Sequence, residues 1–261
     1  MIRLGVCAAP KDMALLAKQG FEYIEVGLSW LHGLSDEDYA RELATAKAAP
    51  INVEAANGMV PGTIKLTGPD VDEAVIRAYL EKAFSRAHEM GIKTVVFGSG
   101  AARRVPEGWP QAEAWRQIAR YLTVANEYGE KYDINIAIEP LRRGECNIMN
   151  LVTEGTLMSA LLNLPRVGTL GDTYHMVCGH EPYSAFVQAG TLLKHVHISH
   201  TVGIDQGRIW PAPDDGEDYV EIFAALKAAG YNGRVSIEAG YTDMAVDGVK
   251  AFAVLDAARK A

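Results

Sequence analysis

The sequence has few cysteines, no long apolar run and no excess of basic residues among its 261 positions. The three cysteines, Cys7, Cys146 and Cys178, are an odd number without CxxC spacing, which is typical of reduced thiols in a cytosolic protein. No apolar run approaches the roughly 18 residues that a membrane-spanning helix needs. The start, MIRLGVCAAP, lacks the apolar stretch of a secretory signal. We therefore expect a cytoplasmic protein that does not enter a membrane.

Positive charge is scarce, because 25 Lys and Arg face 33 Asp and Glu and give a formal net charge of −8. Enzymes of nucleic acids usually carry a basic stripe, since phosphate contacts supply most of their affinity. Here the only tight basic pairs are Arg103-Arg104 and Arg142-Arg143. The negative balance also disfavours binding to an anionic membrane surface. We expect neither nucleic acid nor membrane as a partner.

No linker, low-complexity tract or charge block divides the chain. Apolar residues make up 49% of the sequence and charged residues 22%, which is ordinary for a globular protein. The length also fits a (β/α)8 barrel, which typically needs about 250 residues in one domain. One domain over residues 1–261 is therefore expected.

Short β-branched apolar runs alternate with longer segments rich in Ala, Leu, Glu and Lys, a pattern typical of buried parallel strands and their connecting helices. The strands are expected at residues 2–6, 23–26, 52–55, 94–97, 135–138, 167–170, 195–198 and 235–237. The helices are expected at residues 11–18, 36–48, 70–90, 111–132, 153–162, 183–188, 219–229 and 244–260. Three of these helices end at Gly20, Gly91 and Gly230, where left-handed C-caps are favoured.

Eight successive strand-then-helix units predict an α/β fold, a single (β/α)8 TIM barrel. The rival is an open, doubly wound sheet. That fold would place a phosphate-binding glycine fingerprint after the first strand, and GVCAAPKD provides none.

Acidic and imidazole side chains end four consecutive predicted strands: Glu139 in INIAIEP, Asp172 in VGTLGD, His197 in HVHIS and Glu238 in VSIEAG. In a barrel these strand ends form the active-site rim. Three carboxylates meeting on one rim would repel each other, and a divalent cation relieves that repulsion. Any one of these four residues, taken alone, is equally compatible with a surface ion pair or a strand-end cap. Four of them in register on successive strands favour a shared metal ion. Oxygen ligands with one imidazole suit Mn²⁺, Mg²⁺ or Co²⁺.

His195 and His197 are two residues apart, so their side chains share one face of the strand. His197 is nearer the carboxyl end and is assigned to the metal, whereas His195 is interpreted as a core histidine. His200 is compatible with either a solvated or a pocket position. Glu25 and Asn57 end the second and third predicted strands and could face the pocket, without a definite role.

The segments AIEPLRRGECNIMN, GDTYHM, LKHVHIS and LKAAGYNGRVSIEAG, in this order, resemble the xylose isomerase-like barrel superfamily. The likeness covers essentially the whole chain and is nearest to the branch of ketose 3-epimerases, inosose isomerases and dehydratases, and hydroxypyruvate isomerases. It implies a metal-dependent sugar isomerase or epimerase that binds one divalent ion, Mn²⁺ before Mg²⁺ or Co²⁺. Relatives in this superfamily are often dimers or tetramers, so a homo-oligomer is compatible with the resemblance.

The same resemblance assigns roles to single residues. Glu139 and Glu238 become the acid/base pair as well as metal ligands, while Glu145 and His175 become contacts to a sugar substrate. Ketose 3-epimerases also carry an arginine about six residues after the metal histidine, where this chain has Gly203. Arg208 is the candidate for that substrate contact.

These roles imply proton abstraction beside a carbonyl, with the metal stabilising the enediolate that forms. One glutamate takes the proton, and the other returns a proton to the opposite face or to the neighbouring carbon. A dehydratase or lyase acting on an inosose or keto-sugar begins with the same step and is the alternative. An apurinic-site endonuclease is disfavoured because the first three strand ends, GVCAA, EVGLS and EAANG, carry no histidine. A non-catalytic sugar-binding barrel is disfavoured because all four ligand candidates are present.

Two further rim features have competing interpretations. The segment FGSGAARR could cradle an anion, but a tight loop with solvated arginines is the favoured interpretation. Trp30, Trp109 and Trp210 fall in presumed rim loops, where they could stack on a sugar or pack in the core.

Overall fold

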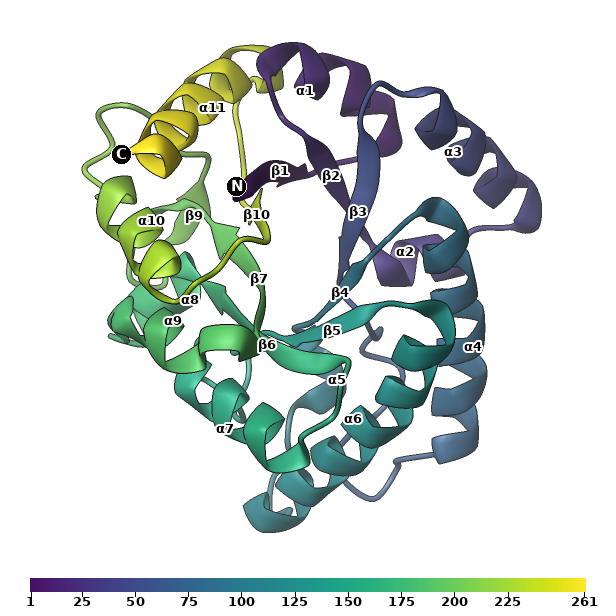
Figure 1. Ribbon diagram of the computed structural model, residues 1–261. Coiled ribbons are helices and arrows are strands. Elements are labelled where there is room, and N and C mark those ends of the chain that lie inside the picture. Colours follow the sequence, from purple (N-terminus) through teal and green to yellow (C-terminus); the bar gives the residue numbers. More distant parts are fainter.

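The computed structural model describes residues 1–261, and eight parallel strands close into a barrel (Figure 1). These strands are β1 (Arg3–Cys7), β2 (Tyr23–Gly27), β3 (Asn52–Asn57), β4 (Thr94–Phe97), β5 (Asn135–Ile138), β6 (Val167–Asp172), β7 (Leu193–Ile198) and β10 (Arg234–Ile237). Strand β10 pairs with both β7 and β1, and this closes the ring. The predicted (β/α)8 barrel is confirmed.

Helices surround the barrel on its outside, as the view along its axis shows (Figure 1). They are α1 (Met13–Gln19), α3 (Asp36–Ala48), α4 (Glu73–Met90), α6 (Gln111–Tyr132), α7 (Val152–Leu162), α9 (Ser184–Ala189), α10 (Tyr219–Ala228) and α11 (Met244–Lys260). The predicted ranges differ from these bounds by a few residues at most. The left-handed caps are confirmed too, since Gly20 has φ 107° and Gly91 has φ 94°.

Several short elements at the strand ends were not predicted. They are the helices α2 (Leu28–Gly33), α5 (Gly100–Arg103) and α8 (Thr173–Cys178), the 3₁₀ turns Pro10–Asp12 and Gly190–Leu192, and the hairpin of β8 (His200–Gly203) and β9 (Gly207–Ile209). Elements of three to six residues are too short to show a periodic pattern in sequence. None of the helices combines the length and apolar character needed to cross a membrane.

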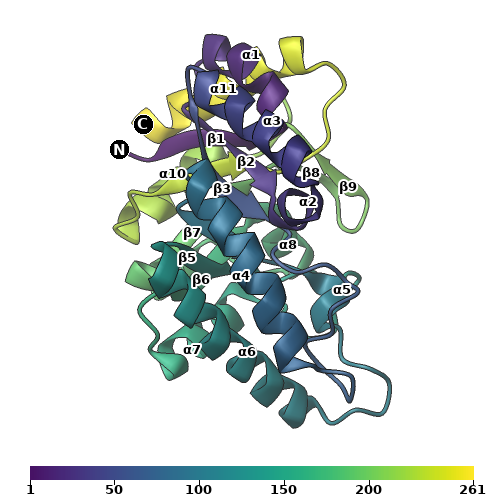
Figure 2. The same ribbon diagram turned by 90° about the vertical axis from the view of Figure 1, so that its right-hand side faces the viewer.

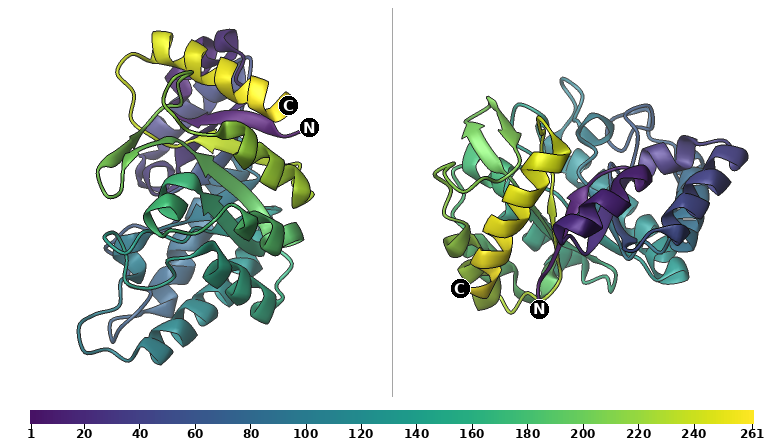
Figure 3. Two further views of the ribbon diagram at one scale, coloured as in Figure 1. Left: turned by 90° about the vertical axis from the view of Figure 1, so that its left-hand side faces the viewer. Right: turned by 90° about the horizontal axis from the view of Figure 1, so that it is seen from above.

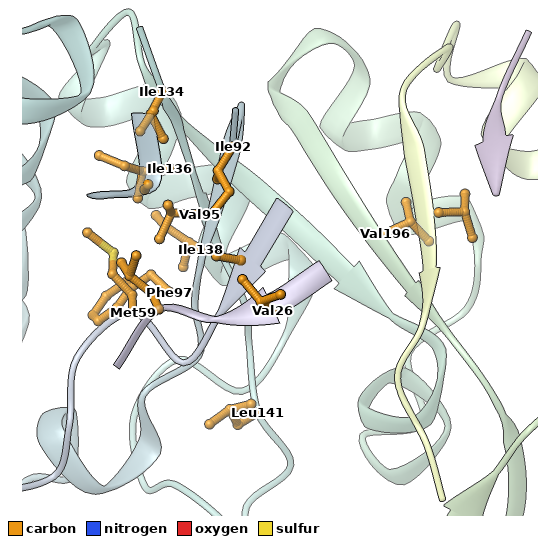
Figure 4. Close-up of a cluster of buried hydrophobic side chains, with 14 of the residues drawn as sticks. Val26, Met59, Ile92, Val95, Phe97, Ile134, Ile136, Ile138, Leu141 and Val196 are labelled. Carbon is orange, nitrogen blue, oxygen red and sulfur yellow. The ribbon is translucent and has the colours of Figure 1, made fainter. Parts of the chain in front are cut away.

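The main hydrophobic core lies between the strands and the helices. Val95, Phe97, Ile136 and Ile138 point outward from β4 and β5 into this layer (Figure 4). The alternate residues Val96, Ala137 and Leu170 face inward and form a separate small cluster inside the barrel. This alternation is the strand period of two, and it leaves the barrel interior to a distinct set of side chains.

The two ends of the chain lie side by side at one end of the barrel (Figure 3). Arg259 of α11 donates a hydrogen bond to the carbonyl of Ile2 at 2.8 Å and thereby ties them together. The β8–β9 hairpin lies on the opposite side, at the carboxyl ends of the strands (Figure 2). The candidate site residues gather at this second end.

Candidate active site

The four predicted ligand residues come together at the carboxyl end of the barrel. The ring nitrogen Nδ1 of His197 lies 2.9 Å from Oε1 of Glu139, 3.1 Å from Oε2 of Glu238 and 3.7 Å from Oδ2 of Asp172. One possible ligand atom from each of the four side chains lies within 4.8 Å of all the others. The four side chains thus form one cluster, here called the rim cluster.

Strand pairing and one glycine position these groups. Asp172 ends β6 in register with His197 of β7, while Glu139 and Glu238 directly follow β5 and β10. A Cβ atom at Gly98 would lie only 2.2 Å from Oε2 of Glu139, so a side chain there would displace that carboxylate. The loop after β4 therefore needs glycine at this position.

The two glutamates of the rim cluster differ in electrostatic setting. Burial, and next the negative charge of Glu238, raises the pKa of the Glu139 carboxyl above its usual range. Burial also acts to raise the pKa of Glu238, but the nearby His197 and Arg208 charges outweigh it and lower that pKa. Two carboxyl groups with pKa values moved in opposite directions are suited to separate acid and base roles.

Arg208 reaches the rim cluster from the β8–β9 hairpin. Its guanidinium donates to the Asp172 carboxylate, and its Nη2 lies 2.7 Å from Oε2 of Glu238. Thr201 pairs with Arg208 across the hairpin, so the fold-back places this late residue over the strand ends. Gly203 lies in the bend of the same hairpin, opposite Gly207.

The two predicted substrate contacts beyond the cluster lie at its edge. His175 is buried in α8, where its Nδ1 accepts a hydrogen bond from the backbone of Arg142 at 3.2 Å. Glu145 is exposed, forms an ion pair with Arg142 at 2.8 Å, and lies 4.0 Å from Nε2 of His175. The structure brings these two residues next to each other.

A cavity of about 330 Å³ opens beside the rim cluster. It is lined by Cys7, Ala8, Ala9, Glu25, Val26, Gly27, Trp30 and Asn57. Asn57 links it to the cluster, because its side-chain amide donates to Oε1 of Glu238 at 3.0 Å. Small molecules commonly bind in concave sites of this size that combine apolar walls with a few polar groups.

The aromatic rim residues have different environments. Trp30 lies in α2, is 40% exposed and lines the cavity. Trp210 is buried and packs against Phe21 and Tyr241, so core packing is the correct interpretation for it. Trp109 is half-buried and donates from its indole nitrogen to Gln117 at 3.2 Å.

The favoured interpretation of solvated arginines in FGSGAARR is wrong for Arg103. Its side chain is fully buried and donates to the backbone carbonyls of Phe97 at 3.0 Å and Glu139 at 2.7 Å. It therefore joins the ends of β4 and β5, directly behind the rim cluster. Arg104 is exposed and donates to the carbonyl of Glu145 at 2.8 Å. Arg103 therefore has no part in an anion cradle.

Sequence reasoning assigned no role to the residue behind His197, which is Glu25 of β2. Both its carboxylate oxygens contact ring nitrogens, with Oε1 3.0 Å from Nε2 of His197 and Oε2 2.7 Å from Nε2 of His195. All three side chains are fully buried. The sequence did contain one indication of this contact, a glutamate inside the apolar strand YIEVG. An acidic side chain is rarely buried unless another group pairs with it.

The chemistry of the rim cluster fits a divalent cation. It offers three carboxylates and one imidazole nitrogen, with Arg208 as the nearby cationic side chain. Carboxylate oxygens with one imidazole are ligands that Mn²⁺, Mg²⁺ and Co²⁺ accept. The second ring nitrogen of His197 is already engaged by Glu25, as in many metal sites of proteins.

Known proteins resemble this chain along most of its length. It is 28% identical to the D-psicose 3-epimerase of Agrobacterium fabrum over 85% of this chain and 76% of that protein. It is also 28% identical to a probable ketose 3-epimerase of Synechocystis sp., over 69% of this chain and 61% of that protein. The inosose isomerase of Bacillus velezensis is 25% identical over 87% of this chain and 82% of that protein.

Solved structures support the fold. A D-allulose 3-epimerase from Methylomonas sp. superposes with a TM-score of 0.84, at 22% identity, over 98% of this chain and 96% of that one. The family model described as xylose isomerase-like TIM barrel matches residues 13–256. The named relatives are epimerases and an isomerase, and the chain is an enzyme of this kind. The chain thus belongs to the xylose isomerase-like TIM barrel family.

Proposed function

We propose that this protein is a divalent-metal-dependent isomerase or epimerase of a small sugar or keto-sugar. The observation that carries the proposal is the rim cluster, in which three carboxylates and one imidazole meet within 4.8 Å at the active end of the barrel. The relatives named as D-psicose 3-epimerase and probable ketose 3-epimerase support a sugar as substrate. Mn²⁺ is the proposed ion, with Mg²⁺ and Co²⁺ as substitutes.

Glu139, Asp172, His197 and Glu238 would hold the cation. When bound, it supplies Lewis-acid stabilisation of negative charge on the oxygens of a carbonyl and its neighbouring carbinol. The protein's own part is to position these groups and to keep bulk water from them. Glu139 and Asp172 are buried, and His197 is completely so.

The proton transfer is assigned to the two glutamates. Glu238 has a side chain 21% exposed and accepts from Asn57, which lines the cavity, so it is the carboxylate placed to accept a proton from a carbon acid there. Glu139 is the more deeply buried of the two, with a side chain 7% exposed, and is assigned the return of the proton. Return to the opposite face inverts one carbon, and return to the neighbouring carbon moves the carbonyl.

The other site residues are assigned to substrate. Arg208 would direct its guanidinium toward substrate oxygens at the rim cluster, where a cation strengthens the acidity of the neighbouring C–H. His175 and Glu145 would form hydrogen bonds with hydroxyl groups of the substrate farther from the reacting carbon. Trp30 would cover one face of the sugar in the adjoining cavity.

Hydrogen exchange into the substrate tests the reaction class. Purified protein is stripped with a chelator, reloaded with Mn²⁺, and incubated in D₂O with a panel of ketoses, inososes and 3-keto-sugars. The expected result is deuterium at the carbon beside the carbonyl, together with an epimer or an aldose–ketose isomer. The product spectrum also separates the dehydratase alternative, because loss of water gives a product lighter by one water molecule.

Two results would refute the proposal. One is a protein that binds no divalent cation by titration, although its four rim side chains are intact. The other is turnover of a sugar that continues unchanged in the chelator-treated protein, since the rim cluster would then have no part in it.

A further inference from the structure

A column of polar side chains runs inside the barrel behind the rim cluster. Tyr23 contacts Ser236 at 2.9 Å, and Ser236 contacts Nε2 of His195 at 3.2 Å. The same ring nitrogen lies 2.7 Å from Glu25, which in turn reaches Nε2 of His197 at 3.0 Å. These side chains come from three strands, β2, β7 and β10, and all of them are buried.

Burial of an ionised carboxylate among apolar strands is costly unless hydrogen bonds satisfy it. Here Glu25 has two acceptor oxygens, and each faces one imidazole N–H position. The arrangement requires His197 to present Nε2–H toward Glu25. With a cation held among Glu139, Asp172 and Glu238, the remaining nitrogen Nδ1 would then present its lone pair to that cation.

We propose that Glu25 is a positioning residue that fixes the ring of His197 so that Nδ1 alone is free to bind the metal, and that His195 holds Glu25 in place. This inference rests on the metal site of the proposed function and adds to it a residue outside the four ligands. Glu25 does not contact the rim cluster's carboxylates, so it acts through His197. Ser236 and Tyr23 extend the hydrogen-bonded support of His195 away from the rim cluster.

A purely structural role for Glu25 would make a different prediction. The same barrel contains another buried glutamate, Glu54, whose carboxylate accepts from Arg3 at 2.6 Å and from Arg234 at 2.7 Å. Glu54 lies at the amino ends of the strands, away from the rim cluster. Loss of its charge should cost stability without changing a metal site, so Glu54→Gln is the matched control.

The experiment compares wild type, Glu25→Gln and Glu54→Gln by Mn²⁺ titration followed by electron paramagnetic resonance. An amide offers one acceptor oxygen in place of two, so the two histidines can no longer both donate to residue 25. Glu25→Gln is expected to weaken Mn²⁺ binding by about 10- to 100-fold, the usual effect of removing a partner of a ligating histidine. Glu54→Gln should keep wild-type Mn²⁺ affinity while melting at a lower temperature.

Nitrogen NMR of the histidine rings supplies a second readout. In protein loaded with diamagnetic Zn²⁺, His197 should show a protonated Nε2 and a metal-bound Nδ1, and this signature should be lost in Glu25→Gln. If Glu25→Gln does not fold, Glu25→Asp is used instead; its carboxylate keeps the charge but is too short to reach both rings. Its affinity should then lie below that of wild type.

The outcomes separate this inference from the metal proposal. Glu25→Gln with wild-type Mn²⁺ affinity and an unchanged His197 spectrum would overturn the positioning role. A wild-type protein that binds no metal would refute the proposed function, and the metal-free spectrum would then test the contact by itself. In the metal-free protein, a downfield Nε2–H proton of His197 that persists in Glu25→Gln would overturn the positioning role of Glu25.

Discussion

Buried carboxylates occupy both ends of this barrel, and their surroundings differ. At the amino ends of the strands, Glu54 receives two guanidinium groups, Arg3 and Arg234. At the carboxyl ends, three carboxylates of the rim cluster have one guanidinium, Arg208, and one imidazole close by. The first end is neutralised by its own side chains, whereas the second retains an excess of negative charge.

The contrast separates stability from function within one scaffold. An acid that is fully paired by the protein contributes to folding and has no capacity left for a ligand. Carboxylates that are only partly paired repel one another, and they can therefore still bind a cation. In (β/α)8 barrels the carboxyl-end loops carry the chemistry and the amino end carries stability, and the charge balance here follows that division.

The largest effect is expected from Glu238→Gln. The amide cannot accept a proton, so the rate of sugar turnover should fall by about 10²- to 10⁴-fold, the usual contribution of a general acid or base. Thermal unfolding should change little, because Glu238 remains 21% exposed and its amide substitute still accepts from Asn57. Turnover equal to that of wild type would contradict the role of Glu238 in proton transfer. It would also contradict the assignment of function to the carboxyl end of the barrel.

Asp172→Asn should abolish most of the stabilisation that a cation supplies. At a Mn²⁺ concentration of 100 times its Kd, a bound ion stabilises a folded protein by about 2.7 kcal/mol. Differential scanning calorimetry should therefore show a higher Tm for wild type on adding Mn²⁺, and a much smaller rise for Asp172→Asn. The Glu54→Gln variant should keep the full wild-type rise. A rise in Tm that is equal in all three would place the ion elsewhere.

Glu54→Gln sharpens the comparison from the other end. It removes the carboxylate between Arg3 and Arg234, so the free energy of unfolding should fall by about 1.5–3 kcal/mol, the range for hydrogen bonds to charged groups. Urea unfolding monitored by circular dichroism measures this loss. Turnover per folded molecule should remain at the wild-type value, and a matching loss of turnover would show that the two ends are not independent.

The smallest effect is expected from Arg208→Gln. This change removes the guanidinium that pairs with Asp172 and Glu238, so a divalent cation has less positive charge to oppose it. Mn²⁺ should bind a few-fold more tightly, while KM for the sugar should rise because a substrate contact is lost. Isothermal titration with Mn²⁺ and steady-state kinetics separate the two changes, and weaker Mn²⁺ binding would contradict the charge argument.

Sequence reasoning predicted the barrel because its cues are local and repeated. Apolar β-branched runs, helix-forming segments and glycine caps such as Gly20 and Gly91 each act within a few residues. The four ligand candidates were also visible, because every parallel strand of a barrel delivers its last residue to the same end. The rim cluster was therefore predictable from strand ends alone.

The positions of Arg208, Arg103 and Glu25 were not predictable in the same way. Arg208 depends on a short hairpin that folds back, and Arg103 depends on a four-residue helix that turns its side chain inward. Glu25 depends on ring closure, because β2 faces β7 only across the closed barrel. Local patterns establish which residues end each strand, whereas contacts across the barrel establish which of them meet. The physical reason is that strand formation is governed by neighbours in sequence, and the pairing of buried charges by neighbours in space.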